Sequence, residues 1–321
     1  MRAIRIHEFG QPEVMRLEEL ADPEPGPEEV LLRVAAAGVN PHDTYIRAGA
    51  VPGIRLPLTP GQDAAGVALA VGSAVTSCAA GDKVYVGGSL SGTYATHALC
   101  HEKQVHRLPE RLSFEQGAAI HVPYATAHRA LFQRAAARAG ETVLIHGASG
   151  SVGLAAVQLA RAAGLRVLST GGSASGRALV ARQGAHEVFD HHVADMADRV
   201  RAATDGRGPE IILEMLASAN LERDLDLLAP RGRVVVVGSR GRIEIDPLRT
   251  MVGELSVLGV GLLNATPDEL REIHAALREG LASGALQPVV REVLPLAEAA
   301  RAHRLVLAPG AAGKIVLSCQ F

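Results

Sequence analysis

The stretch Val143-Leu144-Ile145-His146-Gly147-Ala148-Ser149-Gly150-Ser151-Val152-Gly153 decides the fold of this chain. Its first three residues form an apolar run typical of a buried strand, and the glycines that follow predict a tight turn. From Ser151 onward the apolar residues recur at helical spacing and share one face. That face contains Val152, Ala155, Ala156, Leu159 and Ala163. The stretch therefore predicts a strand that passes through a glycine turn directly into a helix.

The glycine turn has the spacing of a dinucleotide-binding loop, Ala148-x-Gly150-x-x-Gly153, with Gly147 one place earlier. Gly147 would form the tight turn, Gly150 would let a diphosphate approach the backbone, and Gly153 would bring the helix close to the strand. The start of the helix offers free N–H groups and the positive end of its dipole. A glycine-rich turn between a strand and a helix can also be purely structural. The pattern of strands and helices around it favours dinucleotide binding.

That pattern is an alternation of apolar strands with Ala-rich helical segments, which is typical of βαβ units. We expect strands at Thr142–His146, Arg166–Ser169, Glu187–Phe189, Glu210–Leu213 and Arg233–Val237. Each successive pair of strands is separated by enough residues for a crossover helix. The fold class that follows is α/β with a doubly wound parallel sheet.

The first third of the chain has a different pattern, with short β-prone runs broken by Gly, Pro and Asp. Examples are Val30–Val34 and Lys83–Val86, the second of which follows the turn signal Gly81-Asp82. The pattern changes near residue 124. We therefore expect a β-rich domain over residues 1–123 and a nucleotide-binding domain over residues 124–264.

The remaining residues, about 265–321, are expected to complete the first domain. A helical segment at Pro267–Leu281 leads to Gln287-Pro288-Val289-Val290, and Gly313–Leu317 reads as a closing strand. The tail would then return to the β-rich domain.

Composition excludes several other classes of protein. With 321 residues, 48% of them hydrophobic, the chain can form two cores. The 34 acidic and 32 basic residues nearly cancel and form no basic block, so nucleic acid is not an expected partner. Neither a signal peptide nor a membrane-spanning run is visible. Cys78, Cys100 and Cys319 lack metal-binding or redox spacing, which favours a reducing, cytoplasmic setting.

The choice of dinucleotide depends on the end of the second strand, where an NAD site normally holds an acidic residue. The segment from Thr170 to Arg177 contains no carboxylate, and none follows before Glu187. It offers the hydroxyl groups of Ser173 and Ser175 and the guanidinium of Arg177, which suit a ribose 2'-phosphate. An alternative reading makes Arg177 a solvated helix residue. The absent acid favours NADPH as the cofactor.

Several segments resemble the zeta-crystallin-like quinone oxidoreductases of the medium-chain dehydrogenase/reductase superfamily, in the same order and with the same spacing. They are Gly38–Pro41, Thr44–Gly49, Thr59–Gly61, His146–Gly153, Gly184–Phe189 and Val237–Gly241. The resemblance covers essentially the whole chain. It implies a GroES-like β-rich catalytic domain beside a Rossmann domain, with the active site in the cleft between them.

The resemblance also implies which residues bind NADPH. They are Tyr45, Ser149, Gly150, Ser151, Val152, Gly172, His191, Asn220, Val237, Gly238, Ser239, Arg240, Val260, Gly261 and Leu262. Ser173 and Arg177 join this set on the residue argument above. Of the adjacent histidines His191 and His192, we expect the side chains to point in opposite directions, with His191 near the cofactor.

Zinc alcohol dehydrogenases of the same superfamily carry ligands where this chain has Asn40 and Gly61-Gln62-Asp63. An amide and a glutamine cannot replace the thiolate and imidazole of a catalytic zinc site. We therefore expect no metal. Three positions depart from the pattern of the zinc-free relatives: Ser151 replaces a glycine, and Ala125 and His128 replace residues that are often aromatic.

The sequence thus predicts an NADPH-dependent oxidoreductase that transfers hydride or electrons to a quinone, with Asn40 and Tyr45 orienting the acceptor. An α,β-unsaturated ketone or aldehyde meets the same chemical demand, and an NADPH-binding protein with little turnover is a second alternative. The apolar run Ser256–Val260 is a candidate sheet edge. A partner copy would cover such an edge, so we expect a homodimer or homotetramer.

Overall fold

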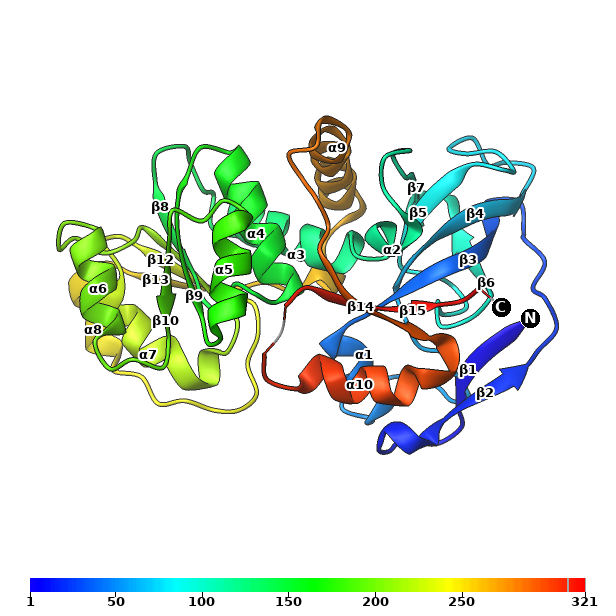
Figure 1. Ribbon diagram of the computed structural model, residues 1–321, viewed down its shortest axis with the longest axis horizontal. Coiled ribbons are helices and arrows are strands. Elements are labelled where there is room, and N and C mark those ends of the chain that lie inside the picture. Colours follow the sequence, from blue (N-terminus) through cyan, green and yellow to red (C-terminus); the bar gives the residue numbers. More distant parts are fainter. Residues whose placement is uncertain (311, 321) are drawn as a thin grey trace. The chain divides into compact units, whose positions relative to one another are not determined.

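The computed structural model describes residues 1–310 and 312–320, which divide into two compact units (Figure 1). Unit 1 comprises Met1–Val122, Pro288–Pro309 and the final segment from Gly313, and unit 2 is built on Pro123–Gln287. The first boundary lies next to the expected one at residue 123.

The second boundary differs from the expected position at residue 264, because helix α9 (Pro267–Ser283) belongs to unit 2. Glu269 near the start of α9 lies 2.9 Å from Arg129 Nη1, and its carbonyl accepts a hydrogen bond from Gln133 Nε2 at 3.2 Å. The side chains of Ile273, Leu277 and Leu281 are buried. Helical periodicity revealed the helix, but only these contacts show which core it joins.

Unit 2 contains a six-stranded parallel sheet. Its order is β10 (Glu187–Asp190), β9 (Arg166–Gly171), β8 (Thr142–Ile145), β11 (Ile211–Glu214), β12 (Arg233–Val236) and β13 (Ser256–Gly259). The chain runs outward from β8 to β10, then returns to β11 and runs outward the other way. This confirms the doubly wound sheet, and the reversal between β8 and β11 is the place where such sheets bind ligands.

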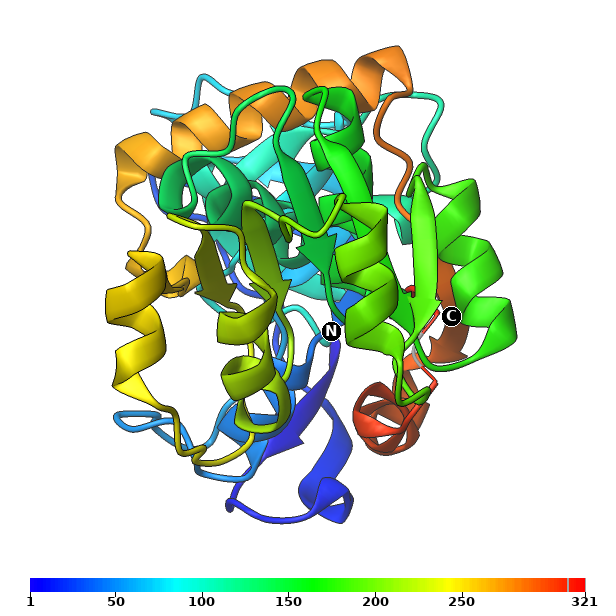
Figure 2. The same ribbon diagram turned by 90° about the vertical axis from the view of Figure 1, so that its left-hand side faces the viewer.

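Helices cover both faces of this sheet (Figures 1 and 2). One face carries α4 (Ser151–Ala162) and α5 (Ala174–Arg182), and the other carries α6 (Met196–Ala203), α7 (Ala217–Leu227) and α8 (Pro247–Gly253). A cluster of buried apolar side chains lies under α6 and α7. Its buried residues include Leu144, Leu168, Met196, Val200, Ile212, Leu221, Leu225 and Val234.

Unit 1 contains a seven-stranded, mostly antiparallel sheet. Its order is β14 (Val290–Pro295), β15 (Lys314–Ser318), β3 (Glu29–Val39), β4 (Asp63–Val71), β5 (Lys83–Gly87) and β7 (Val105–Arg107), and β6 (His97–His101) also pairs with β3. A hairpin of β1 (Arg2–Ile6) and β2 (Met15–Glu19) completes the strands. β15 pairs with β3 and β14 pairs with β15, so the end of the chain joins the sheet of the N-terminal strands.

Few helices belong to unit 1. They are α1 (Pro41–Arg47), α2 (Phe114–Gly117) and α10 (Ala299–Leu307), while the short α3 (Thr126–His128) lies in unit 2. Short 3₁₀ turns occupy Pro12–Val14, Glu102–Gln104, Leu262–Asn264 and Leu296–Glu298. Helix α1 begins directly after the long central strand β3, and Pro41 at its first position suits a helix start.

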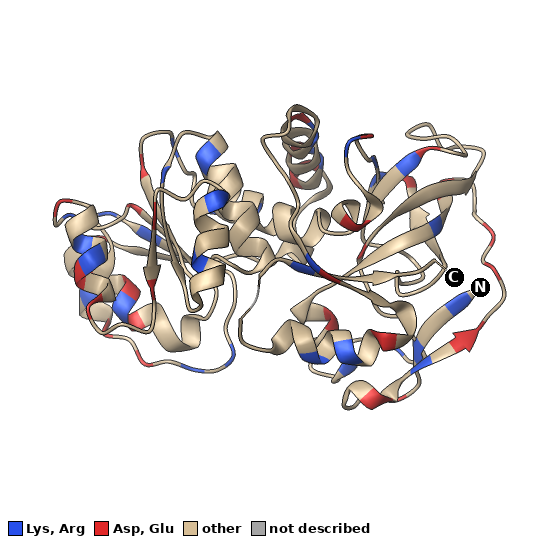
Figure 3. Cartoon of the chain, in the orientation of Figure 1, with Lys and Arg blue, Asp and Glu red and all other residues tan. Residues whose placement is uncertain are grey.

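Charged residues of both signs are interspersed over the two units, without a block of one sign (Figure 3). Within residues 1–310 and 312–320, no helix combines the length and apolar character needed to cross a membrane.

Candidate functional site

The glycine loop between β8 and α4 has the geometry that its spacing predicts. Gly147 adopts a φ of +55°, in the left-handed region that favours glycine. A Cβ at Gly153 would lie 2.6 Å from the Ala148 Cα, so this glycine lets the helix pack against the loop. At Gly150 the nearest atom to an added Cβ is the Gly147 oxygen at 3.6 Å. The space beside Gly150 is therefore open to a ligand.

The start of α4 provides hydrogen-bond donors at this open side. Gly150 precedes the helix, and its carbonyl accepts from the N–H of Leu154 at 2.9 Å. The N–H groups of Ser151, Val152 and Gly153 come before this first helical bond, so no carbonyl of the helix can accept them. Ser151 is half-buried and is accommodated at the first helical position. These donors and the helix dipole fit a diphosphate.

A cavity of about 230 Å³ lies at the carboxyl ends of the strands in unit 2. It is lined by His146, Gly147, Thr170, His191, Met196, Glu214, Met215, Leu216, Asn220 and Arg223. Two residues of the predicted set, His191 and Asn220, thus line the same cavity as the glycine loop. Its place at the switch between β8 and β11 is the expected one for a nucleotide.

The predicted residues of the last two strands lie at the same sheet edge. Val237–Arg240 directly follow β12, and Val260–Leu262 directly follow β13. A Cβ at Gly238 would lie 2.5 Å from the Met215 carbonyl oxygen, so a glycine is needed for the two strand ends to approach. The backbone N–H of Arg240 donates to Ser218 Oγ at 3.3 Å.

The Arg177 guanidinium is held at the end of β9, where a ribose 2'-phosphate was expected. Its Nη1 donates to the carbonyls of Gly171 and Gly172, both at 3.2 Å, and lies 2.7 Å from Asp190 Oδ2. Arg177 is therefore not a freely solvated residue. Ser173 caps α5 by accepting from the Gly176 N–H at 3.0 Å, and its hydroxyl lies 3.4 Å from that of Ser175.

An acidic residue, Asp190, lies beside Arg177, although the segment from Thr170 to Arg177 contains no carboxylate. Asp190 ends β10 and is aligned with Gly171 in the neighbouring strand β9. The carboxylate is far along the chain from the position where an NAD site holds its acid, but the strand pairing brings it beside Arg177. The backbone N–H of His192 and the Arg177 guanidinium hold the pKa of Asp190 below its usual value.

The two adjacent histidines do not point in opposite directions, so that prediction was wrong. The rings of His191 and His192 are 4.5 Å apart, and an added Cβ at Gly172 would lie 2.7 Å from His191 Nε2 and 2.9 Å from His192 Nε2. The alternation of a strand does not apply here, because β10 ends at Asp190 and the histidines lie in the following turn. Burial and the neighbouring His192 lower the pKa of His191.

A buried group of titratable side chains under the cavity was not predicted from the sequence. His146 Nε2 lies 3.0 Å from Asp224 Oδ1 and 3.8 Å from Glu214 Oε2. Among the described residues, this trio is the group whose His, Cys, Asp or Glu atoms lie close enough together to bind a metal. Burial raises the pKa of Glu214, and its Oε1 accepts a hydrogen bond from Asn220 Nδ2 at 3.1 Å. Glu214 thereby orients Asn220.

In unit 1 the side chain of Asn40 is buried and is hydrogen-bonded at both ends of its amide. Its Oδ1 accepts from Lys314 Nζ at 2.5 Å, and its Nδ2 donates to Asp63 Oδ2 at 3.1 Å. Only 3% of Asn40 is exposed. Each end of the amide is bonded within the protein, which fixes the orientation of the Asn40 side chain. The role of Asn40 in orienting the electron acceptor stays a prediction.

The same network anchors helix α1. The Asn40 backbone N–H donates to Asp43 Oδ2 at 2.8 Å, and the Tyr94 hydroxyl donates to the same oxygen at 3.0 Å. Burial raises the pKa of Asp43 to about 7. Tyr45, two residues farther along α1, is 38% exposed. The buried network thus fixes a helix whose tyrosine ring is available to a ligand.

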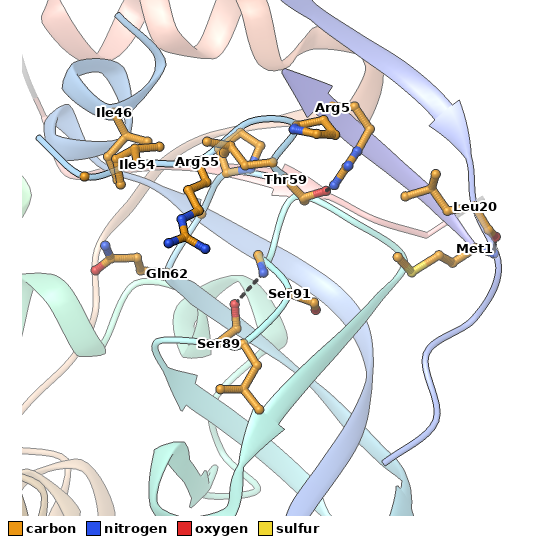
Figure 4. Close-up of a pocket in the computed structure, with 17 residues that line it drawn as sticks. Met1, Arg5, Leu20, Ile46, Ile54, Arg55, Thr59, Gln62, Ser89 and Ser91 are labelled. Atoms are coloured by element: carbon orange, nitrogen blue, oxygen red, sulfur yellow. Dashed lines mark hydrogen bonds between the residues drawn. The ribbon is translucent and has the colours of Figure 1, made fainter. Parts of the chain in front are cut away.

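A larger cavity, of about 600 Å³, lies in unit 1 beside this helix (Figure 4). Its lining includes Ile46, which follows Tyr45, and Gln62, which stands at one of the zinc-ligand positions of the related alcohol dehydrogenases. Arg5 and Arg55 supply the side-chain charges of the lining. The volume is within the range of small-molecule sites in proteins.

Both units match known protein families. Residues 26–110 match the family described as alcohol dehydrogenase GroES-like domain, and residues 151–279 match the family described as zinc-binding dehydrogenase. The sequence is 48% identical over 320 residues to a quinone oxidoreductase from Homo sapiens, an alignment that covers 99% of this chain and 97% of the relative.

Solved structures with the same fold cover 99% of the chain. An NAD-dependent alcohol dehydrogenase superimposes with a TM-score of 0.92 at 31% identity and 99% coverage of its own chain. The Escherichia coli quinone oxidoreductase complexed with NADPH gives 0.90 at 30% identity and 100% coverage. CurK enoyl reductase gives 0.90 at 27% identity and 98% coverage.

Proposed function

The chain belongs to the zeta-crystallin-like quinone oxidoreductases of the medium-chain dehydrogenase/reductase superfamily, and on this premise we propose that it is an NADPH-dependent quinone oxidoreductase. The overall reaction converts NADPH, one proton and a quinone into NADP⁺ and a hydroquinone. NADPH supplies the hydride from its nicotinamide ring. The protein supplies binding, alignment and the exclusion of water.

The glycine loop is the observation that carries this proposal. Gly150 leaves open space beside the backbone, and the N–H groups at the start of α4 could donate to a diphosphate placed there. The cavity that begins at Gly147 extends along the strand ends to His191 and Asn220. A dinucleotide of NADPH type fits this combination of a diphosphate cradle and an adjoining cavity.

The preference for NADPH over NADH rests on α5 and its surroundings. Arg177, Ser173 and Ser175 supply a guanidinium and two hydroxyl groups close to Gly172. Asp190 shares the guanidinium, so the phosphate has to compete with this carboxylate. We assign Arg177 as the main donor, and we assign His191 and Asn220 to the nucleotide on the strength of their place in the cavity.

Tyr45 and Asn40 take different roles in the reaction. Tyr45 presents a partly exposed ring and hydroxyl from α1, so it is our candidate to contact the nicotinamide or the acceptor. Asn40 acts as a positioning residue, because its hydrogen bonds to Lys314 and Asp63 fix the start of the same helix.

A second function is favoured by the likeness to CurK enoyl reductase. Reduction of an electron-poor carbon–carbon double bond uses the same hydride and the same proton balance as reduction of a quinone. The two functions are separated by mixing the protein and NADPH with a panel of quinones and enones and following the absorbance of the reduced nicotinamide. Binding of NADPH without any oxidation would instead identify a protein with little turnover.

Self-association through β13 is part of the proposal. β13 is an edge of the unit 2 sheet, and its Val257 is 42% exposed. Met251 and Val252 on the adjacent α8 are 69% and 74% exposed. A second copy of this chain would cover these apolar side chains and the free strand edge. Light scattering should give the mass of a dimer or tetramer, and a monomer at micromolar concentration would refute this.

The setting of the protein is proposed from its cysteines. Cys78, Cys100 and Cys319 are free and buried, and burial raises the pKa of each thiol. None of them has a disulfide to maintain, which suits a reducing, cytoplasmic compartment.

A further inference from the structure

We propose that the 600 Å³ cavity of unit 1 binds the part of the electron acceptor that carries a negative charge, so that the preferred acceptors are quinones with an anionic substituent. The inference rests on the proposed function and specifies its substrate class. It follows from the side chains that surround the cavity, which combine an apolar wall with hydrogen-bond donors and positive charge.

The charged side chains that line the cavity are all positive. Arg5 and Arg55 line the cavity, and no aspartate or glutamate among the described residues contributes to its lining. In Figure 4 the Arg55 side chain projects into the middle of the view toward Ser89, and Arg5 lies beside Thr59. Two guanidinium groups without a carboxylate attract an anion and disfavour a cation.

Both arginines lack an acidic partner within residues 1–310 and 312–320. Arg5 Nη1 makes a long hydrogen bond of 3.4 Å to Thr59 Oγ1, and Arg5 Nε is buried without a partner. Arg55 is exposed toward the cavity side and forms no ion pair in this part of the chain. A partly buried guanidinium with unused donors is costly unless a ligand supplies acceptors.

The serine hydroxyls of the lining also act as donors. Ser89 Oγ accepts from the Gly92 backbone N–H at 2.9 Å, and Ser91 Oγ accepts from the Leu99 N–H at 2.8 Å. Because each oxygen already serves as an acceptor, its own O–H hydrogen remains available to a ligand. Carboxylate, sulfonate and phosphate groups bind guanidinium and hydroxyl donors in this way.

The apolar part of the wall indicates where the ring of the acceptor lies. Ile46 and Ile54 lie together on one side of Arg55 in Figure 4, and both line the cavity together with Leu58. Ile46 follows Tyr45 on α1, and Gln62 lies on the same wall. The anionic group would contact Arg55 and the serines, while the ring would rest on the isoleucines toward Tyr45.

The experiment compares two acceptors with the same ring and side chain, one charged and one neutral: a 1,4-naphthoquinone with a propionate side chain, and the methyl ester of the same compound. Steady-state oxidation of NADPH gives KM and kcat for each. We expect the wild-type KM to be about three- to tenfold lower for the carboxylate, as is typical of a charge-assisted contact that is partly exposed. Added salt should shrink this difference.

Variants assign the effect to the cavity. Arg55→Gln should abolish the difference in KM between the carboxylate and the ester, while Arg55→Lys should keep part of the preference. Arg5→Gln should weaken the preference less. Arg16→Gln is the matched control, since Arg16 lies on β2, is exposed and does not line the cavity. Equal KM values in the wild type, or equal effects of Arg55→Gln and Arg16→Gln, would overturn the proposal.

Calorimetric titration without NADPH separates this proposal from the proposed function. If neither quinone is reduced, the proposed function fails. The anion site would still be supported if the carboxylate binds more tightly than the ester and this difference is lost in Arg55→Gln. If both quinones are reduced but bind equally, the anion site fails alone.

Discussion

Lys314 and Asp63 form a buried ion pair across the central strand of unit 1, with Lys314 Nζ 2.6 Å from Asp63 Oδ2 and both side chains 1% exposed. Lys314 comes from β15 and Asp63 from β4, the two strands that pair with β3 at Gly38. Gly38 of β3 makes this contact possible. A Cβ at that position would lie 2.7 Å from Lys314 Cε and 2.9 Å from Asp63 Cβ.

Removing the lysine should destabilise the protein strongly. Lys314→Met leaves the Asp63 carboxylate buried without its cation, which typically costs about 3–5 kcal/mol. The control is the double variant Lys314→Met/Asp63→Asn, in which no buried charge remains unpaired. Urea denaturation at neutral pH should show that the double variant recovers a large part of the lost free energy of unfolding. Equal losses in the single and double variants would contradict the assigned pairing.

The raised pKa of Asp43 predicts a pH-dependent stability. The folded-state pKa of about 7 exceeds the ordinary value of 3.8, because burial disfavours the charged carboxylate. A carboxyl group whose pKa is raised by folding stabilises the folded state at low pH. This contribution to the free energy of unfolding is lost as the pH rises from about 4 to 7. The loss is at most about 1.4 kcal/mol per pH unit.

Asp43→Asn should remove this dependence, since an amide can accept the same hydrogen bonds from Asn40 and Tyr94 without becoming charged. The difference in the free energy of unfolding, Asp43→Asn minus wild type, should therefore increase as the pH is raised from about 4 to 7. Chemical denaturation at several pH values measures the difference. A constant difference across this window would rule out the raised pKa.

Two glycines of the loop allow a matched comparison. Gly150→Ala places a methyl group where the nearest atom is 3.6 Å away, so the fold should tolerate it while the diphosphate loses its close approach. Gly153→Ala places the methyl group 2.6 Å from the Ala148 backbone, which should destabilise unit 2 by about 1–3 kcal/mol. We expect NADPH affinity to fall roughly tenfold in Gly150→Ala with little change in Tm. A large drop in Tm for Gly150→Ala would show that the space is not open.

The pair of Arg177 and Asp190 should set cofactor selectivity. Arg177→Ala should weaken NADPH by about an order of magnitude and leave NADH nearly unchanged, because only NADPH carries the 2'-phosphate. Asp190→Asn keeps the hydrogen bond from the His192 N–H and removes the competing charge, so it should strengthen NADPH relative to NADH. Asp195→Asn, at an exposed residue paired with Arg199, is the control. Equal losses of both cofactors in Arg177→Ala would assign Arg177 a structural role.

Activity should not depend on zinc. Lys314 Nζ contacts both Asn40 and Asp63, and its positive charge would repel a divalent cation at these two positions. Elemental analysis should find no stoichiometric zinc, and strong chelators should leave activity intact. Activity that is lost on chelation and restored by zinc would refute this, and the His146, Glu214 and Asp224 group would then be the first place to look for the ion.

Local pattern predicted most of the fold. The strands of unit 2 agree with the predicted ranges within about two residues, because their apolar runs and flanking glycines are local signals. The glycine loop was predicted for the same reason. Membership of α9 in unit 2 was missed, since helical periodicity does not reveal which core a helix joins.

The candidate site was predicted less completely, because its decisive contacts join residues that are distant in sequence. Lys314 lies 274 residues from Asn40, and nothing near either residue indicates their contact. The pairing of β9 with β10 places Asp190 beside Arg177, and the end of β10 turns His191 and His192 to the same side. Such contacts depend on strand order and on where a strand ends.

Quinone-dependent oxidation of NADPH by the purified protein tests the central claim most directly. With NADPH held constant, the absorbance of the reduced nicotinamide is followed after addition of each quinone or enone, and NADH is compared under the same conditions. The account predicts rapid oxidation with quinones, slower oxidation with enones, and a lower KM for NADPH than for NADH. Oxidation with enones alone, or binding of NADPH without oxidation by any quinone, would contradict it.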